Sequence, residues 1–460
     1  MNLARALAVR LCCVSGLLAA PFCAAQGFDD IAGGLLSEAL ASNLALRAAE
    51  GDLRAAESAL AAARARYWPE ISLNARYTLA DGGRQIEFPL GQLLNPAYQT
   101  LNELLVAQGQ QARFAPLPDQ AFDFQRAHEQ DSRLSLRLPL YAPGLGAAVD
   151  AQRARVAGSG AGREALQRQV RRDMWQAYAR HLQAVGRVDV LAEAVGVLQS
   201  NLRAVEALHR EGSVTRDQVL RAQAELLGLQ QQWQTAQVAV VESRAWVNAL
   251  RNHPLESPVP VPEVGATEGL PAAGKAADLL PTPRPERTQA AAARAAAEAL
   301  VKVASAARRP QLALGIDAGT QGTDYGLGPG YNYVAASVLL TWKFFDGGAS
   351  RAAVAEARAL ARRSAAMEQD VAQSLALQSL RAREQLKSAL LSRELALSRN
   401  AAAASALRIA QRQRDEGVIA QVAFLDTQAA ALAARQGVVD AELSLRVAQA
   451  EHVFAGEDPP

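Results

Sequence analysis

Cysteine is the scarcest chemically reactive residue in this chain of 460 residues. Only Cys12, Cys13 and Cys23 occur, and all three fall within residues 1–25. The rest of the sequence therefore offers no disulfide, no thiolate nucleophile and no cysteine ligand for a metal ion.

An excess of charge of one sign is lacking as well. The chain has 48 Lys and Arg against 46 Asp and Glu, a net charge of +2. Binding to nucleic acid needs concentrated basic surface, so no nucleic acid partner is expected. The histidines are scattered, with no metal-ligand spacing; they are His128, His181, His209, His253 and His452. The sequence therefore predicts no catalytic residue, no metal site and no cofactor, and a protein that is not an enzyme.

Long hydrophobic runs are also missing. After residue 25 no segment approaches the roughly 18 uninterrupted apolar residues of a membrane helix. Residues 1–25 are typical of a secretory signal peptide, with a basic start, an apolar run and small residues before an expected cleavage at Gln26. Lipidation at Cys23 is not expected, because Phe22 is bulky where lipoprotein signals have a small residue. An exported chain of this kind enters a membrane only as a β-barrel.

What the chain has instead is an internal duplication. Residues 26–251 and 286–460 each show the pattern helix, strand, loop, strand, long helix, tight turn, helix. The segment between them, 252–285, is rich in proline, so it predicts a linker or a wrapped extended segment. The matching stretches are 65–69 with 306–310, 137–154 with 341–359, and 210–226 with 415–432.

Long amphipathic helices dominate both repeats. From Leu166 to Leu208 apolar residues recur about every 3.5 positions, the coiled-coil period. Gly158, Gly160 and Gly162 near the start of that helix predict weak or bent helix there. Glycines in the turns near 212 and 417 are typical of helix C-termini, so each long helix is expected to fold back on the next. The predicted helices are 35–67, 147–210, 214–250, 285–308, 348–414 and 418–454.

Four segments alternate apolar and polar residues as two-faced strands do. They lie at about 70–79, 132–141, 311–319 and 333–344, lengths that suit tilted membrane strands. Aromatic residues predict two membrane interfaces. At the helix side these are Tyr67, Trp68, Tyr141, Trp342, Phe344 and Phe345, and at the loop side Tyr325, Tyr331 and Tyr333. Because the smallest membrane barrels have eight strands, several copies of the chain must share one barrel.

With these features the sequence resembles the TolC-type outer-membrane efflux protein family, the outer membrane factors of tripartite efflux or type I secretion systems. The resemblance rests on the duplication and on four segments: YWPEISL (67–73), RRPQLAL (308–314), FFDGG (344–348) and DEGVIAQVAFLDTQ (415–428). It implies a mainly α protein with a membrane β-barrel, a homotrimer whose 12-stranded barrel takes four strands from each chain. The barrel would continue into a long α-helical coiled-coil tunnel through the periplasm.

The same resemblance implies location and partners. The chain would sit in a bacterial outer membrane, in contact with its lipid, and extend into the periplasm. It would conduct substrate passively, with a periplasmic adaptor (membrane fusion) protein and an inner-membrane ABC, RND or MFS pump as partners. The substrate could be a drug, a metal ion or a protein. Because no lipid anchor is expected, the choice tilts towards type I protein secretion or a general-purpose duct.

In the family, two aspartates three residues apart narrow the far end of the tunnel beside the second tip. Asp426 matches the second of them, whereas Ala423 occupies the first and Ile419 lies where an arginine is frequent. The two-ring acidic gate is therefore in doubt, and Asp217 of the first tip is a candidate replacement beside Asp426. Exposed valine and isoleucine at the turns favour adaptor docking. The expected docking residues are Gly212, Ser213, Val214, Thr215, Gly417, Val418, Ile419 and Ala420.

Two further points stay open at this stage. The long loop 82–131 is apolar for an extracellular loop, so it is expected either to fold over the barrel mouth or to be a surface-recognition site. The alternative to a channel is a non-channel periplasmic coiled-coil scaffold or adaptor protein. The four alternating strands argue against it, and an adaptor would need a compact β-domain that the sequence does not show.

Overall fold

The computed structural model describes residues 28–123, 126–262, 284–324, 326 and 328–456. The predicted signal peptide with Cys23, most of the proline-rich segment and Tyr325 lie outside these residues. The chain divides into two units, Met1–Leu53 with Ser159–Ala290 and Met367–Pro460, and Arg54–Gly158 with Ala291–Ala366. None of the described helices has a stretch long and apolar enough to cross a membrane.

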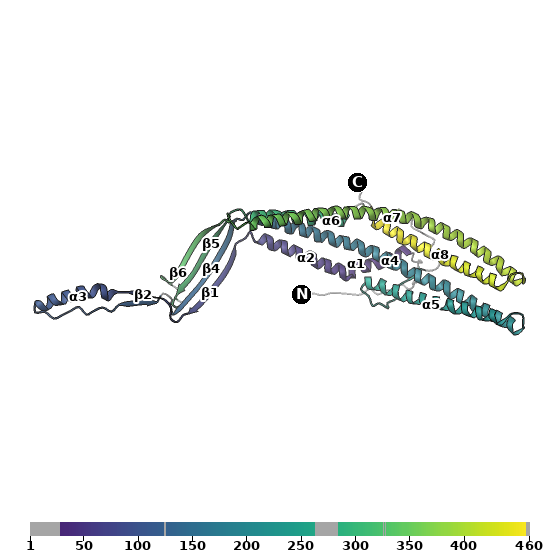
Figure 1. Cartoon of the computed structure of the whole chain (residues 1–460), viewed down its shortest axis with the longest axis horizontal. Helices are drawn as coiled ribbons and strands as arrows, with labels where there is room; N and C mark the ends of the chain where they lie inside the picture. Colours follow the sequence, from purple (N-terminus) through teal and green to yellow (C-terminus); the bar gives the residue numbers. More distant parts are fainter. Residues whose placement is uncertain (1–27, 124–125, 263–283, 325, 327, 457–460) are drawn as a thin grey trace, which may run out of the picture. The chain divides into compact units, whose positions relative to one another are not determined.

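Helices make up most of both repeats. The first repeat contains α1 (Phe28–Ser42), α2 (Leu44–Ala65), α4 (Pro143–Arg210) and α5 (Arg216–Leu250). The second contains α6 (Pro285–Ala306), α7 (Ala349–Asp415) and α8 (Gln421–Phe454). As Figure 1 shows, α4 with α5 and α7 with α8 form two helical hairpins.

The single helix predicted at 35–67 is wrong, because the chain breaks at Asn43 into α1 and α2. The Asn43 side-chain oxygen accepts hydrogen bonds from the backbone N–H groups of Ala45 (3.0 Å) and Leu46 (3.2 Å), as an N-cap does. Its amide group donates to the Leu250 carbonyl oxygen at 3.0 Å, at the end of α5. The break therefore starts a new helix and ties it to a helix far away in the sequence.

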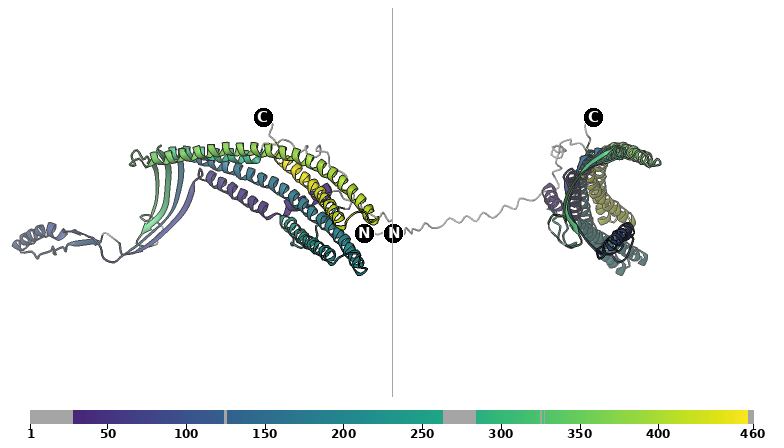
Figure 2. Two further views of the ribbon diagram at one scale, coloured as in Figure 1. Left: turned by 45° about the vertical axis from the view of Figure 1, so that its right-hand side comes forward. Right: turned by 90° about the vertical axis from the view of Figure 1, so that its left-hand side faces the viewer.

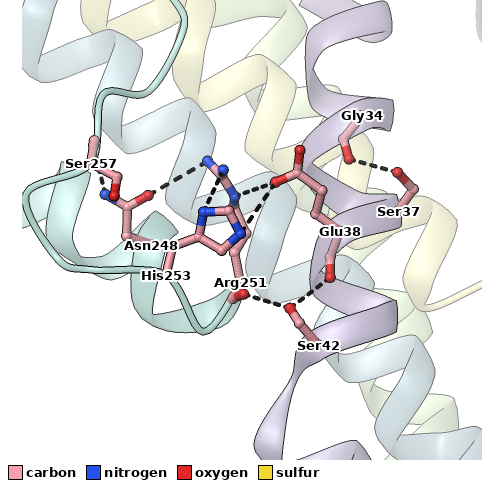
Figure 3. A network of polar contacts seen from close by, with 8 residues as sticks. All are labelled: Gly34, Ser37, Glu38, Ser42, Asn248, Arg251, His253 and Ser257. Atoms are coloured by element: carbon pink, nitrogen blue, oxygen red, sulfur yellow. Dashed lines mark hydrogen bonds and ion pairs between the residues drawn. The ribbon is translucent and has the colours of Figure 1, made fainter.

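An ion pair between a buried arginine and an exposed glutamate reinforces the same junction. Figure 3 shows the Arg251 guanidinium beside Glu38 of α1, with 2.7 Å between Nε and a carboxylate oxygen. Arg251 is buried, so removing its partner would leave an uncompensated charge away from water. Asn248 holds the following turn through hydrogen bonds to the carbonyl oxygens of Leu255 (3.0 Å) and Ser257 (2.8 Å). The described start of the proline-rich segment is thus attached to the helices.

Replacing Asn43 with alanine is expected to lower the free energy of unfolding by about 1–2 kcal/mol, because it removes the cap of α2 and leaves the Leu250 carbonyl without its donor. Asn43→Ser is the control: serine caps a helix but is too short to replace the donor, so its loss should be smaller. Thermal unfolding of the purified proteins in detergent, followed by circular dichroism, measures both. Equal losses would show that the cap contributes nothing.

Helix α4 runs without a break through Gly158, Gly160 and Gly162, so these glycines do not interrupt it. Packing limits the space at only one of these glycines. A Cβ atom at Gly162 would lie 3.0 Å from the Gln289 side chain of α6, whereas one at Gly158 would make an ordinary contact, 3.5 Å from the Ala292 methyl group. Gly162 therefore eases the approach of α6 to α4.

The apolar stripe of α4 is buried over most of its length. Its first part packs with α1 and α5 in a core that includes Val170, Met174, Tyr178 and Val247. Burial raises the pKa of the Tyr178 phenol, and its hydroxyl group donates to the Pro260 carbonyl oxygen at 3.2 Å. A second core further along holds Leu191, Val195, Leu226 and Leu229. The predicted stripe is therefore confirmed, except that Leu208 at its end is exposed.

Four strands form one antiparallel sheet in the order β1 (Glu70–Leu79), β4 (His128–Tyr141), β5 (Gln311–Gly322) and β6 (Asn332–Thr341). Figure 2 shows them side by side as one curved layer. The strand predicted to reach 344 ends at Thr341. The chain is already turning into α7 there, because Gly347 and Gly348 adopt positive φ and Asp346 accepts the N–H groups of Gly348 (3.1 Å) and Ser350 (2.9 Å).

The predicted loop 82–131 is not irregular. It contains β2 (Gln85–Phe88) paired with β3 (Gln120–Asp123), and between them α3 (Leu90–Ala107). The Asp119 carboxylate accepts the N–H groups of Gly91 (2.9 Å) and Gln92 (3.4 Å) and so caps α3 from across the hairpin. A Cβ atom at Gly91 would lie only 2.6 Å from the Leu117 carbonyl oxygen, so only glycine fits there.

Candidate functional site

The four-stranded sheet has two chemically different faces. Its register aligns Ile71, Leu136, Ile316 and Ala336 in one row across all four strands. The next row lies on the opposite face and holds Ser72, Ser135, Asp317 and Ala335. The apolar face is open: Leu73 exposes 74% of its surface and Val334 exposes 77%. A face this apolar and this exposed is typical of contact with lipid rather than with water.

The opposite face is held together by polar contacts. The Ser135 hydroxyl group donates to the Asp317 carboxylate at 2.5 Å across β4 and β5. Gly319 lets the backbones pack tightly, since a Cβ atom there would lie 2.4 Å from the Ser132 carbonyl oxygen. Arg133 and Arg137 lie on this face as well, opposite Asn74 and Glu70 of β1. The face thus balances charges of both signs and suits a water-filled lumen.

The aromatic residues predicted for the helix-side interface gather at one end of the sheet. Tyr67 and Trp68 precede β1, Tyr141 ends β4, and Trp342, Phe344 and Phe345 follow β6. All six are exposed, Phe344 by 87%. The Trp342 indole N–H donates to the Arg308 carbonyl oxygen at 3.1 Å, and its ring meets Phe344 edge to face. Amphipathic rings fixed in this way are typical of a membrane–water boundary.

Two strands of the sheet are edges. In the part of the chain that the structure describes, β1 pairs only with β4 and β6 pairs only with β5. Each edge presents a row of backbone N–H and C=O groups that need partners. In a bilayer such groups are satisfied only when the sheet closes. In a bilayer this sheet would therefore need further strands along both edges.

The two hairpin tips have the same backbone geometry. Gly212 and Gly417 adopt φ of +76° and +73°. In each turn the glycine N–H donates to the carbonyl oxygen three residues earlier, which is that of His209 or Arg414. The N–H of the next residue donates to the carbonyl oxygen five residues earlier, which is that of Leu208 or Gln413. This is the Schellman end of a helix, which favours glycine because it alone adopts left-handed φ without strain. The predicted glycine turns are confirmed.

The tips differ in what they expose. Val418 exposes 72% of its surface. Ile419, which was expected to be exposed, is half-buried instead against a cluster formed by Ala410, Phe424 and Leu425. Val214 of the first tip is half-buried too, while Ser213, Thr215 and Ala420 are exposed. Of the eight residues predicted to dock the adaptor, the exposed ones are therefore small, and Val418 is the prominent apolar side chain among them.

The acidic residues near the tips have different surroundings. Asp426 is exposed on α8. Glu225 on α5 is exposed, but partial desolvation raises its pKa, and the negative charge of Asp426 raises it further. The pKa of Asp217 is lowered, chiefly by a hydrogen bond from the Thr215 side chain. The carboxylate that interacts with Asp426 is therefore Glu225, which no sequence pattern marked because the two residues lie in different repeats.

The described residues contain no group of three or more His, Cys, Asp or Glu side chains that could hold a metal ion. His181 is buried and faces the Ser243 hydroxyl group at 3.1 Å. Burial and the nearby Arg244 lower its pKa, which keeps the imidazole neutral. This histidine is part of the helix packing.

Comparisons with known proteins agree with this geometry. The sequence profile of the family described as outer membrane efflux protein matches residues 35–252 and 282–451. No curated protein matches the chain.

Several solved structures share the fold. The CmeC outer membrane channel of Campylobacter jejuni is 16% identical, with 98% of this chain and 93% of that chain covered and a TM-score of 0.77. The outer membrane protein VceC of Vibrio cholerae is 17% identical, with 93% and 97% covered and a TM-score of 0.74. The MtrE outer membrane channel of Neisseria gonorrhoeae is 18% identical, with 92% and 88% covered and a TM-score of 0.71.

Proposed function

The chain belongs to the outer membrane efflux protein family, and from this premise we propose that it is the outer-membrane duct of a tripartite export system. The family consists of outer-membrane channels, so the chain is a channel with a periplasmic extension and not an enzyme. The resemblance to TolC-type proteins and the mainly helical fold class with a few strands are confirmed. The alternative of a non-channel scaffold or adaptor does not fit this family.

The observation that carries the proposal is the two-faced sheet with two free edges. Three chains, each contributing β1, β4, β5 and β6, would close a 12-stranded barrel by pairing β1 of one chain with β6 of the next. The apolar face would then meet lipid and the polar face would line the lumen. In a closed ring of three chains, the edge strand of each chain pairs with the edge strand of the next, so no edge strand stays unpaired.

The two hairpin tips are the basis for proposing partner proteins of the duct. A periplasmic adaptor protein would contact the exposed small residues of the turns and Val418, and through it the duct would receive substrate from an inner-membrane ABC, RND or MFS pump. Small side chains allow close approach of another helix, and the exposed Val418 supplies apolar surface for the contact. The tips are thus the docking surface in this proposal.

The proposal is tested with the purified protein in detergent and in planar bilayers. A trimer that conducts ions across the bilayer is the expected result. A chain that stays in solution without detergent, as a monomer that does not conduct, would overturn it.

The class of substrate is tested separately, by comparing the proteins in the culture medium of wild-type and deletion strains. Loss of one abundant secreted protein would indicate type I secretion. An unchanged set of secreted proteins would favour efflux of drugs or metal ions.

We further propose that Asp426 and Glu225 line the periplasmic entrance of the pore. Replacing Asp426 with asparagine is then expected to reduce the preference for cations and the block by multivalent cations. It should also lower the pKa of Glu225, because the charge of Asp426 contributes to raising that pKa. In the wild type, Glu225 is protonated at a higher pH than an ordinary glutamate, so cation preference should begin to fall at a higher pH.

Reversal potentials of single channels, measured over a range of pH, check this prediction. In Asp426→Asn the pH at which cation preference falls should move to lower values. Asp217→Asn is the control, because the pKa of Asp217 is lowered and its charge is not among the causes of the Glu225 shift. Unchanged selectivity in Asp426→Asn would remove Asp426 from the pore entrance.

A further inference from the structure

One side of α3 carries an apolar stripe. Leu90, Leu94, Ala97, Leu101 and Leu104 follow one another at spacings of four and three residues, so they share one side of the helix. Leu94, Leu101 and Leu104 expose 39%, 44% and 56% of their surfaces. Exposed leucines in an unbroken row are unusual on a helix that faces water.

The neighbouring side of α3 is already occupied by its own chain. The Asn95 amide group donates to the Leu117 carbonyl oxygen at 2.9 Å and accepts the Leu117 N–H at 2.7 Å. Asn102, two turns later, holds Phe114 in the same way, at 2.7 Å and 3.0 Å (Figure 1 shows this return segment alongside α3). The Tyr98 and Phe114 rings lie 5.2 Å apart between these two clamps. The helix is therefore fixed on this side, and the leucine stripe beside it stays accessible.

We propose that the three copies of α3 in the trimer pack against one another along this stripe and form a short parallel three-helix bundle. This inference rests on the homotrimer of the proposed function. Under threefold symmetry, copies of α3 that run along the symmetry axis are parallel, and identical stripes then face each other. The alternating spacing of four and three residues is that of the a and d positions of a coiled coil, whose apolar residues face the partner helices.

Attachment to the barrel explains how so short a helix could associate. Two heptads are too few for stable association of free helices in water. Residues 80–84 lead from β1 directly into β2, so the copies of α3 would be held near one another by the shared barrel. Association then becomes intramolecular, and the high effective concentration of the other copies favours it.

The charges of α3 favour copies of the same chain over a lipid surface. Helices that lie on membranes are typically rich in Lys and Arg on their polar side. Residues 90–107 contain neither, and their one charged residue, Glu103, is exposed and lies away from the stripe. An anionic membrane surface would repel this side chain, whereas a bundle of three helices leaves it in water.

Cysteine crosslinking in the full-length protein tests the bundle. All native cysteines fall within residues 1–25, so a cysteine placed in α3 is the only thiol after residue 25. Leu101→Cys lies in the stripe, and Glu103→Cys is the matched control two residues away on another side of the helix. Mild oxidation with copper phenanthroline should join two of the three Leu101→Cys chains of each trimer by a disulfide, and should leave Glu103→Cys monomeric on denaturing gels.

The mass of the unoxidised complex in detergent separates this inference from the proposed function. A trimer in which Leu101→Cys does not crosslink, or crosslinks no more than Glu103→Cys, would overturn the helix bundle and leave the duct intact. Disulfides that join one trimer to another would also overturn it. Absence of a trimer in every variant would overturn the proposed function and the bundle with it.

Discussion

Replacing Ala336 with lysine is expected to abolish the assembled trimer in the outer membrane. Ala336 lies near the middle of β6, in the apolar row with Ile71, Leu136 and Ile316. A lysine on the lipid-facing side at the bilayer midplane costs about 2–4 kcal/mol. Three chains would bring three such lysines, so the trimer would lose roughly three times that amount, a large part of the stability of an ordinary protein.

The adjacent residue provides a matched control. Ala335 lies on the opposite face, in the row with Asp317 and Ser135, and is exposed as Ala336 is. Ala335→Lys makes the same chemical change but sets the ammonium group beside a carboxylate in the lumen, so trimers should form in normal amounts. Unheated outer-membrane fractions on gels show the trimer directly. If Ala336→Lys assembled as well as Ala335→Lys, the apolar face would not be the one in contact with lipid.

The contrast between these two alanines was predictable from sequence, because strand alternation is a local pattern. The same holds for the glycine turns at 212 and 417 and for the stripe of α4. In each case neighbouring residues decide the structure, and tertiary contacts only extend it. The ends of the elements were less predictable. Strand β6 ends at Thr341, and Asp346 then caps the start of α7.

The remaining features depend on residues far apart in the sequence. The break at Asn43 gains its second contact from Leu250, and the space at Gly162 is limited by Gln289 of α6. Glu225 is perturbed by Asp426 of the other repeat. Helix α3 lies within the predicted loop 82–131, and its cap comes from Asp119 on the return segment. Contacts between residues so far apart cannot be predicted from the periodicity of apolar residues, which indicates only the face of a helix or strand that is buried.

Replacing Gly417 with arginine is expected to abolish export and to leave the trimer intact. Gly417 forms the outermost turn between α7 and α8 and is exposed. A long charged side chain there would prevent another protein from approaching the turn and would place an unpaired charge in the contact. The turn itself would be strained by about 1–2 kcal/mol, because φ is +73°, but the barrel strands are remote from it in the sequence.

Asparagine separates these two causes, because it tolerates left-handed φ and adds little bulk and no charge. Gly417→Asn should therefore export nearly as well as the wild type, whereas Gly417→Arg should fall to the level of the deletion strain. Both variants should give equal amounts of trimer in the outer membrane. Export by Gly417→Arg at the wild-type level would remove this tip from the docking surface. If both variants lost export equally, the geometry of the turn would matter rather than the surface it offers to a partner, since glycine alone meets that geometry without strain.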